Sequence, residues 1–205
     1  RRAPPPPKER VRDPRRTEVA AGGGLHLPLL PGSDVALLHA MLHVMLWEGL
    51  VDTGFIEQHT SGFAALRDRV REFSPAQAAP LCGLKADDIV QAARWFAGVD
   101  GESNAARRPA LSLYCQGLNQ SSSGTDKNTA LINLHLATGQ IGRPGAGPLS
   151  LTGQPNAMGG REVGGLANLL SGHRDLANAD DRAEVAALWG VRDVPAAPGK
   201  SAVEM

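Results

Sequence analysis

The chain has 205 residues, 42% of them hydrophobic, and its 21 basic residues balance its 21 acidic residues. This length allows a substantial core in one or two domains, and the balanced charge argues against a protein that binds nucleic acid through its net charge. The richest apolar run, 35–47, is shorter than the roughly 20 residues of a membrane-spanning helix. The two cysteines, Cys82 and Cys115, form no CxxC motif and cannot supply the four thiolates of an ordinary iron–sulfur cluster. We therefore expect a soluble globular protein without a disulfide framework.

The N-terminal segment is rich in proline and arginine. Residues 1–16 carry seven basic side chains and a run of four prolines, so we expect this part to be extended. A basic arm for nucleic acid is the alternative, but such arms interleave aromatic residues, which this segment lacks. The segment leads into DPRRT, whose acid and arginines could contact the ribose, base edge or phosphate of a nucleotide: Asp13, Arg15 and Arg16.

Helical patterns dominate the first half of the chain. A helix is predicted from 34 to about 50, with Ser33 or Asp34 as its N-cap and with apolar residues on most sides, so it should be buried between layers. His39 and His43 are spaced i, i+4 and could share a metal, but no HExxH pattern surrounds them, and we favour histidines of a core or groove. Further helices, without a recognisable catalytic motif, are predicted at 52–73, 74–83 and 86–97.

A unit of strand, loop and helix is predicted in the second half. Residues 110–115 should form a short buried strand, 117–125 a loop rich in glycine and serine, and 126–138 a helix closed by Gly139. In this arrangement backbone N–H groups and the helix dipole can face a phosphate. The loop contains neither GxGxxG nor GxxxxGK[ST], so it is not an ordinary dinucleotide or ATP site. A purely structural turn is equally compatible with the pattern.

Polar chemistry is concentrated in the stretch 149–165, LSLTGQPNAMGGREVGG. Its glycines allow positive φ and close approach of a ligand to the main chain, which a helix or strand at this place would forbid, so we expect a loop. Among them lie Thr152, Gln154, the soft apolar Met158 and Arg161, whose planar guanidinium suits a flat oxyanion or a phosphate. A mobile glycine-rich linker is the alternative. Helices are predicted to follow at 161–170 and 179–190.

The residues from 117 to 170 resemble the molybdopterin oxidoreductase family. The sequence GLNQSSSGTDKNTALINLHLATGQIGRPGAGPLSLTGQPNAMGGREVGGLANLL is similar to the assimilatory nitrate reductase branch of that family, and DPRRT, LPLLPGSD, HRDLAN and VPAAPGKSAVEM resemble pieces of it in the same order. The resemblance implies an α/β fold with helices packed on a short, mostly parallel sheet. It divides the chain into the segment that ends in DPRRT, part of the domain that binds molybdopterin guanine dinucleotide, and the segment with the active-site loop, at 1–17, 18–148 and 149–205.

Enzymes of this family hold molybdenum between two pterin dithiolenes, each extended by a guanosine diphosphate. The resemblance places near a guanosine end Asp13, Arg15, Arg16, Ser33 and Asp34. It places along the cofactor Gly117, Asn119 and Gln120, and near the pterin Thr152 and Gln154. The substrate face of the metal would be lined by Met158 and Arg161.

The implied reaction is transfer of an oxygen atom from nitrate to reduced molybdenum, with release of nitrite. The resemblance implies a cytoplasmic enzyme fed by an electron-donor protein or reductase subunit. A formate dehydrogenase, which shares the cofactor, is the runner-up, and a non-catalytic module that grips a nucleotide is the alternative of another class.

The sequence departs from the family pattern in two places. PPPPKERVR replaces the apolar strand that precedes DPRRT in the family. The cysteine motif of the family's 4Fe–4S cluster and the cysteine that ligates molybdenum have no counterpart in this chain, so no metal ligand is predicted here. We therefore expect this sequence to be a central part of a longer subunit.

Overall fold

The computed structural model describes residues 9–98, 107–151, 153, 156–164, 169–200 and 203–205. The chain divides into two compact units, Arg1–Leu151 and Thr152–Met205. None of the described helices is long and apolar enough to cross a membrane. Thr152 and Gln154, which the resemblance places near the pterin, lie outside the described residues. The division into 1–17, 18–148 and 149–205 stays a prediction.

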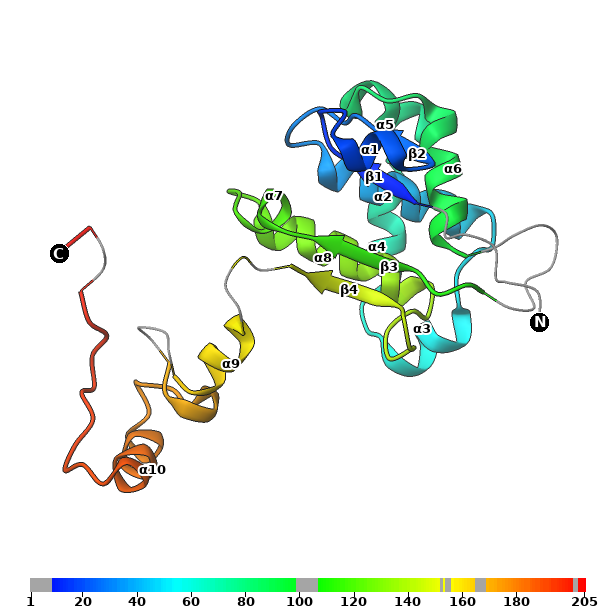
Figure 1. The fold of residues 1–205 in the computed structure, drawn as a ribbon. Coiled ribbons are helices and arrows are strands. Elements are labelled where there is room, and N and C mark those ends of the chain that lie inside the picture. The colour runs from blue at the N-terminus through cyan, green and yellow to red at the C-terminus, as the bar shows by residue number, and fades with distance from the viewer. Residues whose placement is uncertain (1–8, 99–106, 152, 154–155, 165–168, 201–202) are drawn as a thin grey trace, which may run out of the picture. The chain divides into compact units, whose positions relative to one another are not determined.

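The described strands form two parallel pairs. β1 (Arg10–Arg12) pairs with β2 (Leu25–Leu27) after a connection through α1 (Glu18–Gly22), and β3 (Leu111–Tyr114) pairs with β4 (Gly147–Ser150) (Figure 1). Parallel strands joined through helices are typical of α/β folds, so the predicted class is confirmed. The strand predicted from residues 110–115 is also present, shorter by one residue at each end.

β1 forms although its sequence, RVR, lacks the apolar pattern of the family strand. Arg10 donates a hydrogen bond from Nη1 to the carbonyl oxygen of Ala92 at 2.9 Å, and its guanidinium lies over the ring of Phe96. The aliphatic stem of an arginine covers apolar surface while its charged end contacts a polar or aromatic group. Because Arg10 packs in this way, a strand leads directly into Asp13 despite the charged sequence.

α2 (Asp34–Trp47) is the centre of the first unit. It contacts α4 (Phe63–Val70), α5 (Pro75–Cys82), α6 (Ala86–Phe96) and α8 (Gly124–Ala137). Packing against helices on several sides explains why apolar residues cover most of its surface, and the prediction of a buried helix is confirmed. Its buried residues are Leu37, Leu38, Ala40, Met41, Leu42, Val44 and Met45.

Glycines in the left-handed conformation mark the start of α4 and the end of α5. The region 52–73, predicted as an amphipathic helical region, forms two helices, α3 (Thr53–His59) and α4, since the chain turns before α4 at Gly62 with a φ of 73°. α5 agrees with the helix predicted at 74–83: it continues through Pro80 and ends before Gly83, whose φ is 67°. Glycine adopts positive φ without the steric cost of a side chain, so both positions suit the end or start of a helix.

The pair of β3 and β4 is covered on one face. On the inner face, Oγ of Ser112 lies 2.8 Å from Nε2 of His135 on α8, and both residues are buried. On the outer face, leucines remain exposed, with exposed fractions of 48% for Leu111, 58% for Leu113 and 49% for Leu149. Successive side chains of a strand point to opposite faces, so β3 is buried only where α8 covers it. The prediction of a wholly buried strand was wrong.

The first helix of the second unit, α9 (Ala157–Glu162), corrects the prediction of a helix at 161–170. The helix begins earlier because Oδ1 of Asn156 accepts a hydrogen bond from the backbone N–H of Gly159 at 3.2 Å, as an N-cap does. Gly159 and Gly160 lie inside this helix, so the expectation of a loop without a helix was wrong for this part of the stretch. Gly164, after the helix, does have a positive φ of 81°.

The last helix of the second unit, α10 (Ala179–Trp189), agrees with the prediction. Its N-cap is Asn178, whose Oδ1 accepts a hydrogen bond from the N–H of Asp180 at 2.9 Å, and Gly190 ends it with a φ of 66°. A short 3-10 turn, Ser171–His173, precedes it. This unit has a small core of its own, formed by Leu170, Val185, Ala186 and Val194.

Candidate functional site

The first turns of α2 and α8 are joined by an ion pair. Nζ of Lys127 lies 2.8 Å from Oδ2 of Asp34, and the exposed fractions of the two side chains are 7% and 23%. Asp34 is the first residue of α2, and Lys127 lies in the first turn of α8, directly after the loop that follows β3. The pair therefore brings a residue predicted to contact guanosine next to the helix that follows the predicted cofactor loop.

The DPRRT sequence forms a tight turn directly after β1. Oδ1 of Asp13 accepts a hydrogen bond from the backbone N–H of Arg15 at 2.8 Å, and the Asp13 carbonyl oxygen lies 2.8 Å from Nε2 of His26 on β2. Aspartate often bonds the backbone two residues on in this way, which fixes the turn. Arg15 and Arg16 are exposed, so the turn presents two guanidinium groups to solvent, where they can meet a phosphate.

Ser33 occupies the predicted N-cap position of α2, but its side chain does not cap the helix. Its Oγ donates a hydrogen bond to the carbonyl oxygen of Leu30 at 2.6 Å instead. The Ser33 carbonyl oxygen accepts a hydrogen bond from Sγ of Cys82 at 3.8 Å. Burial raises the pKa of the Cys82 thiol, the bond to Ser33 lowers it, and the charge of Asp34 raises it further. The first turn of α2 therefore has no side-chain cap at the end where Asp34 lies.

Positive charge exceeds negative charge around Asp34. Arg12 lies at the end of β1. Burial lowers its pKa, and the charge of nearby Asp34 raises it. On α8, burial first, and then the charges of Arg12 and Arg10, lower the pKa of His135 to about 4. Arg12 and Lys127 thus lie close to one carboxylate, an imbalance that favours an anionic ligand nearby.

The predicted loop 117–125 is partly helical. α7 (Gln116–Asn119) forms a single turn, and α8 begins at Gly124 rather than at residue 126. Nδ2 of Asn119 donates a hydrogen bond to Oγ of Ser150 at 3.0 Å, which ties this loop to the end of β4. Gly117 and Gln120, also predicted to line the cofactor, are exposed. The loop therefore presents polar and backbone groups at the end of β3, where α8 starts.

Gly124 allows this loop to fold back on the start of α8. A Cβ atom at this position would lie only 2.4 Å from the carbonyl oxygen of Asn119. We expect Gly124→Ala to lower the free energy of unfolding by about 1–3 kcal/mol, because the backbone must shift to relieve the overlap. Urea denaturation measures the change. The control is Gly117→Ala, where nothing lies within 4 Å of the added atom. Equal stability of the two variants would contradict the requirement for glycine at 124.

Met158 and Arg161 both belong to α9, in the second unit. Arg161 is exposed, and no carboxylate pairs with it among the described residues. A purely structural role for this arginine would be an ion pair with Glu162, and the described residues show no such pair. The guanidinium retains donors for a flat anion.

The histidines of α2 make packing contacts. The ring of His43 stacks on that of Trp47 with 4.1 Å between centroids, and its Nδ1 lies 3.0 Å from the carbonyl oxygen of Val70. The ring of His39 contacts that of Phe73 edge to face. Burial, and then the charge of Arg69, lower the pKa of His39. Such contacts belong to histidines at a core boundary, which was the favoured interpretation.

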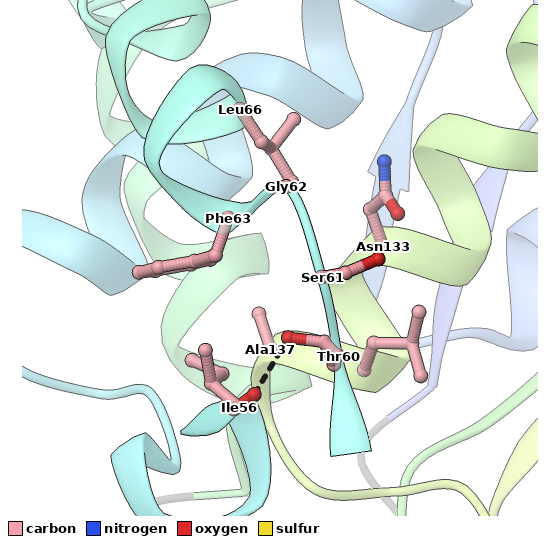
Figure 2. A pocket seen from close by; sticks show the side chains of 9 residues that line it. Ile56, Thr60, Ser61, Gly62, Phe63, Leu66, Asn133 and Ala137 are labelled. Carbon is pink, nitrogen blue, oxygen red and sulfur yellow. Dashed lines mark hydrogen bonds between the residues drawn. The ribbon is translucent and has the colours of Figure 1, made fainter. Parts of the chain in front are cut away.

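A separate pocket of about 160 Å³ lies between the turn that joins α3 to α4 and the C-terminal half of α8. Figure 2 shows Asn133 of α8 opposite Ser61, and Thr60 bonded through Oγ1 to the carbonyl oxygen of Ile56 at 2.7 Å. The lining contains no charged side chain and none of the predicted site residues. A phosphate-bearing cofactor needs charged partners, so this pocket does not fit it.

A sequence model of the family described as molybdopterin oxidoreductase matches residues 12–205. The chain belongs to the molybdopterin oxidoreductase family. This confirms the resemblance and implies a molybdenum–pterin cofactor for the family fold. The match includes every residue that the resemblance assigned to the cofactor or the substrate.

Named relatives within the molybdopterin oxidoreductases are much longer than this chain. A nitrate reductase of Synechocystis sp. is 44% identical over 197 residues, which cover 95% of this chain and 26% of that protein. The alpha subunit of an F420-dependent formate dehydrogenase of Methanocaldococcus jannaschii is 37% identical over 81% of this chain and 24% of that protein. The chain thus spans about a quarter of the length of these relatives.

Among solved structures, the acetylene hydratase from Pelobacter acetylenicus matches with a TM-score of 0.59 and 30% identity. The match covers 66% of this chain and 18% of that one. A likeness at this level supports the same α/β fold for the larger part of the chain.

Proposed function

We propose that this chain is the part of a cytoplasmic nitrate reductase that binds a guanosine end of a molybdenum bis(molybdopterin guanine dinucleotide) cofactor and that supplies Arg161 to the nitrate site. The observation that carries the proposal is the contact between Lys127 and Asp34, because it joins the two regions that the family resemblance assigns to the cofactor. The nitrate reductase relatives, at higher identity than the formate dehydrogenase relatives, support nitrate as the substrate.

Asp34 and the exposed arginines of the DPRRT turn carry the groups that a guanosine diphosphate needs. Guanine carries two neighbouring donors, N1–H and the 2-amino group, and a carboxylate offers two acceptor oxygens at matching spacing. Oδ2 of Asp34 contacts Lys127, and no hydrogen-bond partner of Oδ1 is recorded among the described residues. The exposed guanidinium groups of Arg15 and Arg16 suit the diphosphate. The donor set therefore matches a guanine base linked to phosphates.

When bound, the cofactor would supply the oxygen-atom transfer chemistry at molybdenum. The residues of this chain would bind and orient the cofactor and the nitrate. Asp34 would accept hydrogen bonds from the base, and the exposed arginines of the DPRRT turn would neutralise phosphate charge. Arg161, which is permanently charged, would hold the trigonal plane of nitrate by two parallel hydrogen bonds, with Met158 as soft apolar packing. The 4Fe–4S cluster and the contact to the electron donor would belong to other parts of the subunit.

Formate dehydrogenase is the second candidate, supported by the formate dehydrogenase relative at 37% identity. Formate, like nitrate, is a small flat anion, so Arg161 fits both. Activity assays on the complete enzyme distinguish the two candidate functions. We expect reduction of nitrate with a reduced viologen dye as electron donor, and no reduction of the dye by formate; the opposite pattern would establish the second candidate.

Binding of the guanosine end is tested by Asp34→Asn in the complete enzyme. An amide offers one acceptor instead of two and loses the charge, so we expect the affinity for the guanosine end to fall by about 10-fold or more. The measurement is GMP released by acid hydrolysis and molybdenum by elemental analysis, both per mole of purified protein. Full GMP and molybdenum content in this variant would overturn the proposed role of Asp34.

A further inference from the structure

The Asp34 carboxylate is held in place chiefly by Lys127. The ion pair, at 2.8 Å, is largely shielded from water, because only 7% of the Lys127 side chain and 23% of the Asp34 side chain are exposed. A charged pair with little water around it is screened less than a surface pair. Both partners belong to 14-residue helices that contact each other, α8 and α2. The position of Nζ is therefore fixed by the packing of the two helices.

Neighbouring groups do not provide this restraint in the described part of the chain. Ser33, which precedes Asp34, directs its Oγ to the carbonyl oxygen of Leu30. Arg12 acts on Asp34 through its charge, and no hydrogen bond between the two is recorded among the described residues. Removal of the Lys127 ammonium would therefore leave the carboxylate able to rotate.

Lys127 is placed against the usual preference of a helix. The N-terminus of a helix carries partial positive charge, so its first turn favours acids, as Asp126 illustrates, and disfavours lysine. Arg12 adds a further cation close to Asp34. The helix itself gains nothing from this lysine, whereas its contact with Asp34 across the interface of α2 and α8 accounts for its presence.

We propose that Lys127 is a positioning residue that selects guanine by fixing the plane of the Asp34 carboxylate. The inference rests on the proposed function, in which Asp34 accepts hydrogen bonds from N1–H and the 2-amino group of the base. A carboxylate in a fixed plane can accept hydrogen bonds from both donors at once. A rotating carboxylate accepts a hydrogen bond from only one of them at a time, so it distinguishes poorly between guanine and a base without the 2-amino group. Lys127 thus acts through Asp34 and makes no contact with the base.

The test compares GDP with IDP, which lacks only the 2-amino group. The complete enzyme is produced in cells that cannot make the cofactor, and the dissociation constants of both nucleotides are measured by calorimetry on one preparation. We expect the parent to prefer GDP by about 10- to 100-fold, as a charged hydrogen bond requires. Lys127→Met should reduce the preference to about twofold, and Lys127→Arg, which keeps the cation, should retain most of it. Lys85→Met, an exposed lysine before α6, is the matched control and should keep the full preference.

The ratio of two dissociation constants on one sample does not depend on the folded fraction, so a loss of stability alone leaves it unchanged. A Lys127→Met variant that is less stable but keeps the GDP preference would therefore overturn the positioning role. If this variant does not fold, Lys127→Gln gives a second neutral side chain, and a retained GDP preference in Lys127→Gln would likewise overturn the role. A parent enzyme without any preference for GDP would instead refute the proposed guanine site itself.

Discussion

Arg161→Lys in the complete enzyme is expected to lower kcat/KM for nitrate by about 10- to 150-fold, the equivalent of about 1.5–3 kcal/mol for a charged hydrogen bond. Lysine keeps the positive charge but loses the planar fork that can hold two oxygens of nitrate at once. The exposed position of Arg161 on α9 makes a loss of folding stability an inadequate explanation for such an effect. Steady-state nitrate reduction, together with molybdenum content of the same preparation, measures the change.

The molybdenum measurement separates two roles of Arg161. If the residue holds nitrate, the molybdenum content stays the same and turnover per molybdenum falls. If it grips a phosphate of the cofactor, molybdenum falls in proportion to activity and turnover per molybdenum stays the same. Arg192→Lys, at an exposed position after α10, is the control and should change neither quantity. Full activity with full molybdenum in Arg161→Lys would remove this residue from the site.

His135 is expected to make the folded protein sensitive to mild acid. Its side chain is fully buried between β3 and α8, next to the ring of Phe96, and burial, together with the charges of Arg12 and Arg10, lowers its pKa from 6.5 to about 4. The unfolded chain therefore binds a proton between these two values, while the folded chain does not. Stability from this group is complete above pH 6.5 and falls as the pH drops toward 4, by about 3 kcal/mol in total.

His135→Gln should remove this part of the pH dependence while keeping a polar partner for Oγ of Ser112. Urea denaturation at a series of pH values between 7 and 4.5 measures this pH dependence. Carboxylates titrate in both the parent and the variant, so their contributions cancel in the difference between the two free energies of unfolding. The variant loses packing at pH 7, so the comparison concerns the slope and not the absolute stability. His59→Gln, on the exposed surface of α3, is the control. Parallel curves for the parent and His135→Gln would contradict the prediction.

Local signals account for the elements that were predicted well. Asn178 and Gly190 mark the ends of α10, and Gly139 follows the end of α8 with a φ of 62°. Caps of this kind depend on a few consecutive residues, so a sequence can show them without knowledge of the fold. The family resemblance likewise depends on consecutive motifs, and it gave the candidate site residues as well as the α/β class.

Contacts between distant segments account for what the sequence did not show. The RVR sequence forms β1 because Arg10 donates a hydrogen bond to the carbonyl oxygen of Ala92 and its guanidinium packs on the ring of Phe96, both on α6. The second helix of the region 52–73 is separated at Gly62 because a turn there lets α4 reach α2. In each case a partner far away in the sequence decides between conformations that the local residues allow almost equally.

The sequence by itself determined the family, the parallel α/β class, the helix caps and the polar residues that can bind a nucleotide or a flat anion, because each of these follows from residue types at short spacing. Only the tertiary structure decided that Lys127 pairs with Asp34, that His135 is buried beneath β3, and that the outer leucines of β3 remain exposed. These features depend on which helix faces which strand, and that choice is made by the packing of the whole core.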